Sequence, residues 1–213
     1  MSANSIDATD TNATLKRLVT TPVAVGVVHD ITRRRVTHPV DLSGATIANV
    51  DFSGTEFAAP VSFAKAHFTG LAWFRGCVFR SAVDFTGATF GNDARFDEAQ
   101  FHAAADFSDT EVHGVAAFDR ARLAGATTFD RLCATGNMSL ARVAFDGSSS
   151  FRGAEFLGGL WLDHATFASR PQFAGCDVHG RAWLRGVRIA ELAAAPSARS
   201  LAQAITSYGY EWV

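Results

Sequence analysis

Large apolar residues recur every eleven positions along most of this chain, in two interleaved series whose steps alternate between five and six residues. The first series is Phe57, Phe68, Phe79, Phe90, Phe101, Val112, Leu123, Ala134, Phe145, Phe156, Phe167, Val178 and Ile189. The second series is Phe63, Phe74, Phe85, Phe96, Phe107, Phe118, Phe129, Leu140, Phe151, Leu162, Phe173 and Leu184. A fixed internal period is the signature of a repeat architecture. The pattern therefore predicts a rod of stacked, similar units.

The residue two places before each large residue is usually small, as at Ala66, Cys77 and Ala72. In an extended chain, residues two apart point to the same face, so each unit sends one small and one large apolar residue inward. Polar residues stand between them, and Gly, Ser or Asp commonly follows, which are turn residues. Eleven residues also make three helical turns. The recurrent Gly and the abundant Phe, a poor helix former, favour short strands joined by corners instead.

Three units carry a family resemblance: residues 41–45 (DLSGA), 51–55 (DFSGT) and 84–88 (DFTGA). They resemble the pentapeptide-repeat proteins, and the resemblance extends over residues 40 to 189. It implies an all-β fold, a right-handed quadrilateral parallel β-helix with one unit on each side. This chain departs from the plainest pattern because every second unit after Phe57 has a sixth residue. We therefore expect about 22 residues per coil.

The domain organisation that follows has three parts: a tail and cap at 1–40, the β-helix at 41–189 and a helical cap at 190–213. The ends of a β-helix need caps because they expose strand edges and apolar surface. We expect disorder at 1–12, a helix at 13–19, a strand at 22–28, and two helices, 190–195 and 197–206, divided at Pro196. Residues 131–150 are predicted to form an irregular coil, because Ala134 is too small for its place in the series.

Composition narrows the function classes. A net charge of −2, with no basic stripe beyond residues 33–35, argues against direct binding to nucleic acid. No leader pattern or apolar stretch of membrane length occurs, and the three cysteines suit a reduced compartment, so a cytoplasmic location without membrane association is expected. Cys77 and Cys176 fall at inward positions. No zinc spacing or nucleophile motif appears, so we expect no metal and no cofactor.

Three tryptophans are the first candidate site. Trp73, Trp161 and Trp183 are outward positions separated by multiples of 22, hence on one face, and Arg75 and Arg95 lie beside Trp73. Exposed Trp and Arg are typical of protein interfaces. Three readings are open: the termini of the chain cover this face, a protein partner binds it, or it forms a small-molecule cleft.

An enzyme site where the N-terminal segment crosses this face would use His29, Asp30 or His164. That would be an unusual use of the fold. The sequence therefore leans against catalysis and leaves the question open.

Acidic residues form the second candidate set. Asp84 and Asp106 are expected to stack on one face, and Asp97, Asp119 and Asp163 on another. The family resemblance implies one specific alternative, a DNA mimic that binds DNA gyrase and confers resistance to inhibitors. The charge fits weakly, because duplex DNA carries a charge every ~1.7 Å and a rod of roughly 30 Å would need roughly 18.

The C-terminal aromatic cluster, Tyr208, Tyr210 and Trp212, is predicted to be a cap or a dimer contact. Related rods often pair through their C-termini, so the resemblance implies a homodimer. The interpretation that the sequence favours is a non-catalytic, rigid scaffold for protein–protein interaction. The DNA mimic, and an enzyme or small-molecule-binding protein with a site on the Trp face, are the alternatives.

Overall fold

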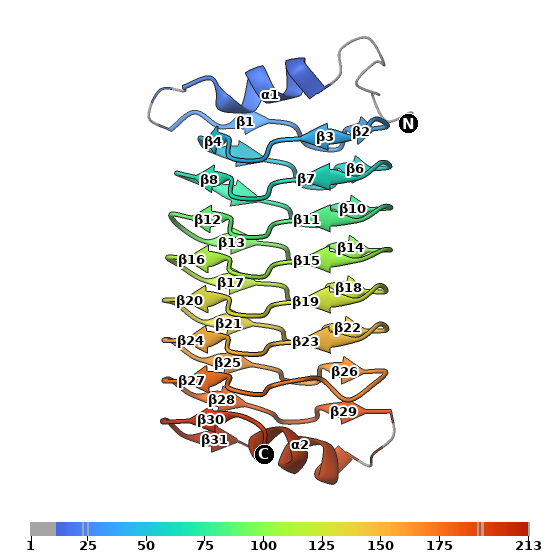
Figure 1. Cartoon of the computed structure of the whole chain (residues 1–213), viewed down its shortest axis with the longest axis vertical. Helices are drawn as coiled ribbons and strands as arrows, with labels where there is room; N and C mark the ends of the chain where they lie inside the picture. The colour runs from blue at the N-terminus through green and yellow to red at the C-terminus, as the bar shows by residue number, and fades with distance from the viewer. Residues whose placement is uncertain (1–11, 23, 25, 191, 193, 213) are drawn as a thin grey trace.

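The chain forms a parallel β-solenoid of about seven turns. The computed structural model describes residues 12–22, 24, 26–190, 192 and 194–212. Figure 1 shows the turns stacked into a straight rod, with α1 (Asn12–Thr20) across one end and α2 (Ala194–Ala202) across the other. The expected all-β, four-sided β-helix is confirmed.

Four parallel sheets form the four sides of the rod, and each is named here after its first strand. The β1 sheet contains β1 (His29–Asp30), β5 (Val50–Asp51), β9 (Ala72–Trp73), β13 (Ala94–Arg95), β17 (Ala116–Ala117), β21 (Met138–Ser139), β25 (Leu160–Trp161), β28 (Ala182–Trp183) and β31 (Glu211–Trp212). The β2 sheet contains β2 (Arg35–Val36), β6 (Glu56–Phe57), β10 (Val78–Phe79), β14 (Gln100–Phe101), β18 (Arg122–Leu123), β22 (Ala144–Phe145), β26 (Thr166–Phe167) and β29 (Arg188–Ile189). The β3 sheet contains β3 (Val40–Asp41), β7 (Val61–Ser62), β11 (Val83–Asp84), β15 (Ala105–Asp106), β19 (Thr127–Thr128) and β23 (Ser149–Ser150). The β4 sheet contains β4 (Thr46–Ile47), β8 (His67–Phe68), β12 (Thr89–Phe90), β16 (Glu111–Val112), β20 (Cys133–Ala134), β24 (Glu155–Phe156), β27 (Asp177–Val178) and β30 (Thr206–Ser207).

The register of the strands follows the sequence period. Val78 pairs with Gln100, and Thr89 with Glu111, so the step between coils is 22 residues. The first and last coils differ: His29 pairs with Val50, a step of 21, and Asp177 pairs with Thr206, a step of 29 that includes α2. The prediction of about 22 residues per coil is confirmed, and residues 22 apart stand above one another on one face.

The core is a set of phenylalanine ladders. Register partners stack nearly parallel, with ring centroids 4.5 Å apart for Phe68 and Phe90 and 4.8 Å apart for Phe74 and Phe96. Rings from adjacent sides meet edge to face, as Phe85 and Phe96 do at 84°. Each of these side chains is fully buried, which stabilises the fold by about 1.5–3 kcal/mol per residue. The ladders therefore hold the coils together and fix their register.

Tight corners follow the strands of the β1 and β3 sheets, and their backbones adopt positive φ. Glycine serves at some corners, such as Gly76 at φ 60°. Charged residues take the same conformation at others, including Glu98 (φ 59°), Arg120 (φ 58°) and His164 (φ 56°). A side chain in this region costs of order 1–2 kcal/mol, so the stacked coils on either side must impose it.

Neighbouring coils approach most closely where a column of glycines runs along the rod. A Cβ atom placed on Gly180 would lie 1.1 Å from the carbonyl oxygen of Gly158, which is sterically impossible. Gly158 meets Gly136 in a similar way, at 2.5 Å. The glycines are therefore required for close packing and not for their φ angles.

Three local expectations were wrong. Residues 131–150 form regular coils, because Leu132 and Met138 fill the inward space that Ala134 leaves and the register continues unbroken. The described residues of 22–28 contain no strand, which begins instead at His29. The C-terminal segment has one helix, and Pro196 lies in its first turn, where its missing N–H is not needed.

The ends of the rod are closed as the sequence suggests. The helix expected at 13–19 is present as α1, which contacts β3 and β4, whereas the disorder expected at 1–12 falls almost wholly outside the described residues. At the other end α2 contacts β29, and the Ile189 amide donates a hydrogen bond to Ser197 Oγ at 3.0 Å. β30 and β31 continue the β4 and β1 sheets by one strand each. Neither described helix has the length and apolar character needed to cross a membrane.

Candidate interaction surface

The three tryptophans lie on the outer face of one sheet, as the spacing predicts. Trp73, Trp161 and Trp183 occupy the outward position of β9, β25 and β28 in the β1 sheet. Trp161 and Trp183 are register partners on adjacent strands. Trp73 lies four coils away, or about 19 Å at ~4.8 Å per strand. The sheet therefore has Trp73 towards one end, and towards the other Trp161 and Trp183 on adjacent strands, followed by Trp212, whose backbone pairs with that of Trp183.

Three hollows follow one another along this face and the corner beside it. Their volumes are about 420, 340 and 460 Å³. Arg75 lines both the first and the second, whereas Asp119, Ala141 and Asp163 line both the second and the third. Because neighbouring hollows share walls, they form one shallow channel parallel to the rod axis, which we call the Trp groove. The residues that line it are Asn49, Leu71, Trp73, Arg75, Asn92, Asp93, Arg95, Asp97, Glu98, Asp119, Arg120, Ala141, Arg142, Trp161, Asp163, Trp183 and Arg185.

The end of the groove beyond Ala141 is mainly apolar. Its walls include Trp161, which is 40 % exposed, and Trp183, which is partly buried. Although the two residues are register partners, no ring contact joins them among the described aromatic pairs. The indoles therefore do not stack on each other as the core phenylalanines do, and open space lies against them.

The middle of the groove is lined by opposed charges. Asp97 lies 4.0 Å from Arg75 (Oδ2 to Nε), and Glu98 lies 3.2 Å from Arg120 (Oε1 to Nη1). Burial raises the pKa of the Asp97 carboxyl, Arg95 opposes this, and nearby Asp119 adds to it. Within the described part of the chain, the Oδ2 atom of Asp97 is buried without a hydrogen bond. This carboxylate is therefore poorly satisfied by its surroundings.

The Trp73 end of the groove is held by hydrogen bonds between coils. Asn49 Oδ1 accepts from the Leu71 amide, and Asp93 Oδ1 accepts from the Val115 amide, both at 2.9 Å. Asp93 also lies 3.8 Å from Arg95. These polar side chains serve the packing of the coils, so fewer of their atoms remain for a ligand.

The two described helices cap the rod at other sides: α1 contacts β3 and β4, and α2 contacts β29. The terminal segments nevertheless reach the edges of the Trp face. Asn49 Nδ2 donates to the Val27 carbonyl oxygen at 3.3 Å, and β31 places the backbone of Trp212 beside that of Trp183. The three readings of the Trp face therefore stay open.

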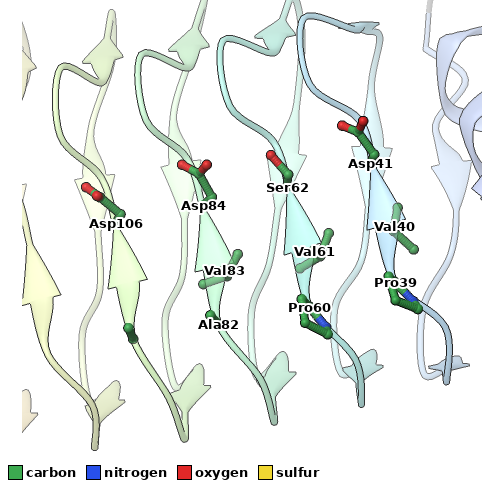
Figure 2. Close-up of a pocket in the computed structure, with 11 residues that line it drawn as sticks. Pro39, Val40, Asp41, Pro60, Val61, Ser62, Ala82, Val83, Asp84 and Asp106 are labelled. Carbon is green, nitrogen blue, oxygen red and sulfur yellow. The ribbon is translucent and has the colours of Figure 1, made fainter.

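A separate hollow of about 510 Å³ lies outside the Trp groove, on the β3 sheet near the N-terminal end (Figure 2). Figure 2 shows Asp41, Ser62, Asp84 and Asp106 in a row along one side of it, as the sequence predicted for Asp84 and Asp106. Asp84 Oδ1 accepts from the Thr86 amide at 2.8 Å, and Asp106 Oδ1 accepts from the Ser108 amide at 2.9 Å. The regular aspartates thus have a structural role, because each one closes a corner.

Asp97, Asp119 and Asp163 also share one column, at the corner after the β1 sheet. Asp119 Oδ1 accepts from Ser139 Oγ and, at 3.3 Å, from the Ala141 amide. Arginines interleave with the acidic residues of the rod, most closely at Arg131, whose Nε and Nη2 donate to Asp109 at 2.6 and 2.7 Å. The acidic columns are therefore real, and arginine pairs interrupt the negative charge of the rod.

The three residues considered for catalysis are not brought together. His29 is buried near the N-terminal cap, with Nε2 2.8 Å from the Thr21 carbonyl oxygen. Asp30 is exposed and accepts hydrogen bonds from Thr32, which lower its pKa. His164 is a corner residue six coils along the rod, 3.9 Å from Asp163. Each has a local role, and none of the three lines the Trp groove or the hollow on the β3 sheet.

The cysteines behave as packing residues. Burial raises the pKa of the Cys77 thiol and raises that of Cys176 to about 12. Cys133 faces outward as predicted, and partial burial, together with Glu155, raises its pKa also. Within the described residues, no three His, Cys, Asp or Glu side chains are placed to hold a metal ion.

Two of the three aromatic residues at the C-terminus are exposed. Tyr208 and Tyr210 are 65 % and 76 % exposed, and Tyr208 stacks on His179 with ring centroids 5.0 Å apart. The backbone of Trp212 pairs with that of Trp183 in the β1 sheet. The contact of two subunits through this end stays a prediction.

Sequence reasoning missed the continuity of the Trp groove. Its middle contains Ala141, a small residue at the corner position where neighbouring coils have Asp119 and Asp163, and Ala141 lines both the second and the third hollow. This exchange of a large residue for a small one is visible in the sequence at the 22-residue spacing.

One comparison with known proteins gives a match. Residues 63–111 match a family model described as pentapeptide repeats (9 copies). The match lies within the segment where the resemblance was noted, and the solenoid continues on both sides of it with the same register. A search of curated proteins finds no match to the chain.

Proposed function

We propose that this chain, a member of the pentapeptide-repeat family, is a non-catalytic scaffold that binds a protein partner along the Trp groove. The observation that carries the proposal is the groove itself: a channel along the rod axis with tryptophan at both ends and arginine and aspartate between them. Trp and Arg are the residue types that dominate binding energy at protein interfaces. A groove of this composition suits an extended or helical segment of a partner.

Rigidity supports this interpretation. Each coil is bonded to the next through four parallel strands and a stacked aromatic core, so the face on which the groove lies has little freedom to lose on binding. The residues suggested for chemistry are dispersed over the rod, whereas the tryptophans share a face. Binding is therefore the function that the geometry supports best.

A selection from a random peptide library displayed on phage tests the proposal. We expect enriched peptides that bind the wild-type protein and lose at least about tenfold in affinity on Trp161→Ala or Trp73→Ala. Gln100→Ala is the matched control, because Gln100 is an exposed, outward strand residue on the neighbouring β2 sheet. Peptides that bind all three proteins equally, or no enrichment at all, would contradict a role for the groove.

The other hypotheses stay predictions. Arginines pair with acidic residues along the rod, among them Asp97 of one acidic column, which gives the DNA-mimic alternative no added support. The homodimer and a cytoplasmic location are equally untested. Titrating the protein into a gyrase supercoiling reaction would test the mimic directly. Inhibition that weakens with added salt would favour it over the scaffold.

A further inference from the structure

The geometry points to a lysine side chain of a protein partner as the group that the hollow on the β3 sheet receives. This inference goes beyond the proposed function, because the hollow lies on a different side of the rod from the Trp groove. Its volume of about 510 Å³ is ample for one long side chain. Figure 2 shows its two parts, a floor of proline, alanine and valine and a row of polar residues along one side.

The floor of the hollow is apolar because small apolar residues stand at the corners that precede the strands of the β3 sheet. Pro39, Pro60, Ala82 and Ala104 occupy these corners in four successive coils, and all four are exposed. No long side chain fills the space above them among the residues that line the hollow. The aliphatic stem of a lysine packs on apolar surface of this kind while its ammonium group reaches a polar edge.

Two carboxylates at the edge of this floor have oxygens left for a cation. Asp84 and Asp106 are register partners on adjacent strands, which are ~4.8 Å apart. Asp84 Oδ1 accepts from the Thr86 amide, and Asp106 Oδ1 accepts from the Ser108 amide and hydroxyl. The Oδ2 atom of each makes no hydrogen bond or ion pair with the described residues. An ammonium group between them can donate to both, because it has three donors on a flexible stem.

The charge of this hollow distinguishes it from the hollows of the Trp groove. Its lining has three carboxylates, those of Asp41, Asp84 and Asp106, and no basic residue, which gives a formal charge of −3. Each hollow of the Trp groove includes at least one arginine. Outside the lining, the pKa of Arg131 is raised chiefly by Asp109, to which its Nε and Nη2 donate, and least by Asp106. The hollow therefore complements a cation supplied by a partner.

A lysine of the chain itself already acts on the first carboxylate of the row. Hydrogen bonds with Ser43 lower the pKa of Asp41, and the exposed Lys16 of α1 lowers it further. Asp84 and Asp106 lie two and three coils beyond Asp41 in the same sheet. These two carboxylates are therefore the ones that a lysine from outside would contact.

The test follows the backbone amides of ¹⁵N-labelled protein by two-dimensional NMR. The probe is acetyl-Gly-Lys-Gly-amide, and in the control peptide the lysine ammonium is acetylated, which keeps the stem and removes the charge. The reporters are the amides of Thr86 and Ser108, since each donates to one of the two aspartates. We expect saturable shifts of both reporters and no shift of the Leu71 amide in the Trp groove. The acetylated peptide should bind at least about fivefold more weakly.

Variants separate the role of charge from that of the fold. Asp84→Asn and Asp106→Asn should each weaken binding of the lysine peptide several-fold. An asparagine oxygen can still accept from the corner amide, so the fold is kept while the charge is lost. Glu111→Gln is the matched control, because it removes one charge from an exposed, outward position on the β4 sheet and should leave binding unchanged.

Other results would overturn the inference. Equal binding of the acetylated peptide would mean that the hollow selects apolar groups without regard to charge. Binding of acetyl-Gly-Arg-Gly-amide about tenfold more tightly would assign the site to arginine, and displacement of the lysine peptide by about 1 mM calcium chloride would assign it to a metal ion. Unchanged binding in both aspartate variants, or no saturable shift at about 100 mM lysine peptide, would show that the hollow does not receive lysine.

Discussion

The interior and the outer Trp face of the rod use the same 22-residue register with opposite results. Inside, Phe63 and Phe85 are register partners and stack with ring centroids 4.8 Å apart. Outside, Trp161 and Trp183 are register partners too, but they make no ring contact among the described pairs. Interior rings are confined by four sheets, whereas an outer ring has neighbours on one side only. Register therefore places a residue, and confinement decides whether it stacks.

This difference separates stability from recognition. The ladders hold the coils together and are inaccessible, whereas Trp161 on the outer face is 40 % exposed and can contact a partner. Substitutions of interior residues should therefore change stability, and substitutions of outer residues should change binding.

The largest effect is expected inside the rod. Phe96 stacks between Phe74 and Phe118, at 4.8 and 4.7 Å, and is fully buried. Phe96→Ala should lower the free energy of unfolding by about 3–5 kcal/mol, because it removes buried surface and leaves a cavity. Urea unfolding followed by circular dichroism measures it. If the free energy of unfolding fell by less than about 1 kcal/mol, the phenylalanine ladders would not be the main source of stability, and the contrast between interior and outer face would not hold.

The second-largest loss of stability is expected from a substitution in the glycine column, where neighbouring coils approach most closely. Gly180→Ala places a Cβ against the Gly158 carbonyl oxygen and should cost about 1–3 kcal/mol or more, as overpacking does. Gly76→Ala is the control, because nothing lies within 4 Å of its Cβ and only its φ of 60° opposes the change. We expect about 1 kcal/mol there. Equal losses in the two variants would mean that close packing between coils is not what the glycine column provides.

Outside, the stability effect should be small. Trp161→Ala is expected to change the free energy of unfolding by less than about 1 kcal/mol, because the side chain is 40 % exposed and not stacked. The same variant should abolish binding of the peptides selected on the wild-type groove. If it unfolds the protein as Phe96→Ala does, the division between stability inside and recognition outside is wrong.

The smallest effects are expected from two surface carboxyls, and their signs are opposite. Burial raises the pKa of Asp97, so its ionised form destabilises the fold, and Asp97→Asn should raise the melting temperature at neutral pH. This gain should vanish as the pH falls below about 4, where Asp97 is protonated in both states. The hydrogen bond from Arg131 lowers the pKa of Asp109, so Asp109→Asn should lower the melting temperature above about pH 4.

In Asp109 the stabilisation is complete above the unfolded pKa and is lost as the pH falls through the lower, folded value. Thermal unfolding of the wild-type protein and both variants between about pH 2 and pH 7 measures the two effects. Shifts of the same sign at neutral pH would show that burial does not govern Asp97.

Much of the fold could be predicted from the sequence, because every repeat places its inward and outward residues at the same positions. The series from Phe57 and Phe63 predicts which residues are inside, and the 22-residue step predicts that Trp73 and Trp161 share a face. The small size of Ala134 wrongly suggested an irregular coil, because Leu132 fills the inward space and the backbone register continues unchanged.

The candidate site was less predictable. The repeat period places Trp161 between Ser139 and Trp183 in register, but it does not predict how neighbouring outward side chains are oriented, and the hollow beside them depends on that orientation. The position of the caps depends on tertiary contacts of short, non-repeating segments. Pro196 was expected to divide two helices, but it lies in the first turn of a single described helix, α2.

Successive coils are separated by the same axial distance, so the number of coils between two surface residues fixes the distance between them. The separation of Trp73 from Trp161 is set by the number of strands between them, four steps of ~4.8 Å, and not by any flexible joint. Loss or gain of one 22-residue coil would change the distance between Trp73 and Trp161 by ~4.8 Å and would leave each end of the groove intact. A partner that contacts both ends of the groove would therefore distinguish rods by the number of coils between the two tryptophans.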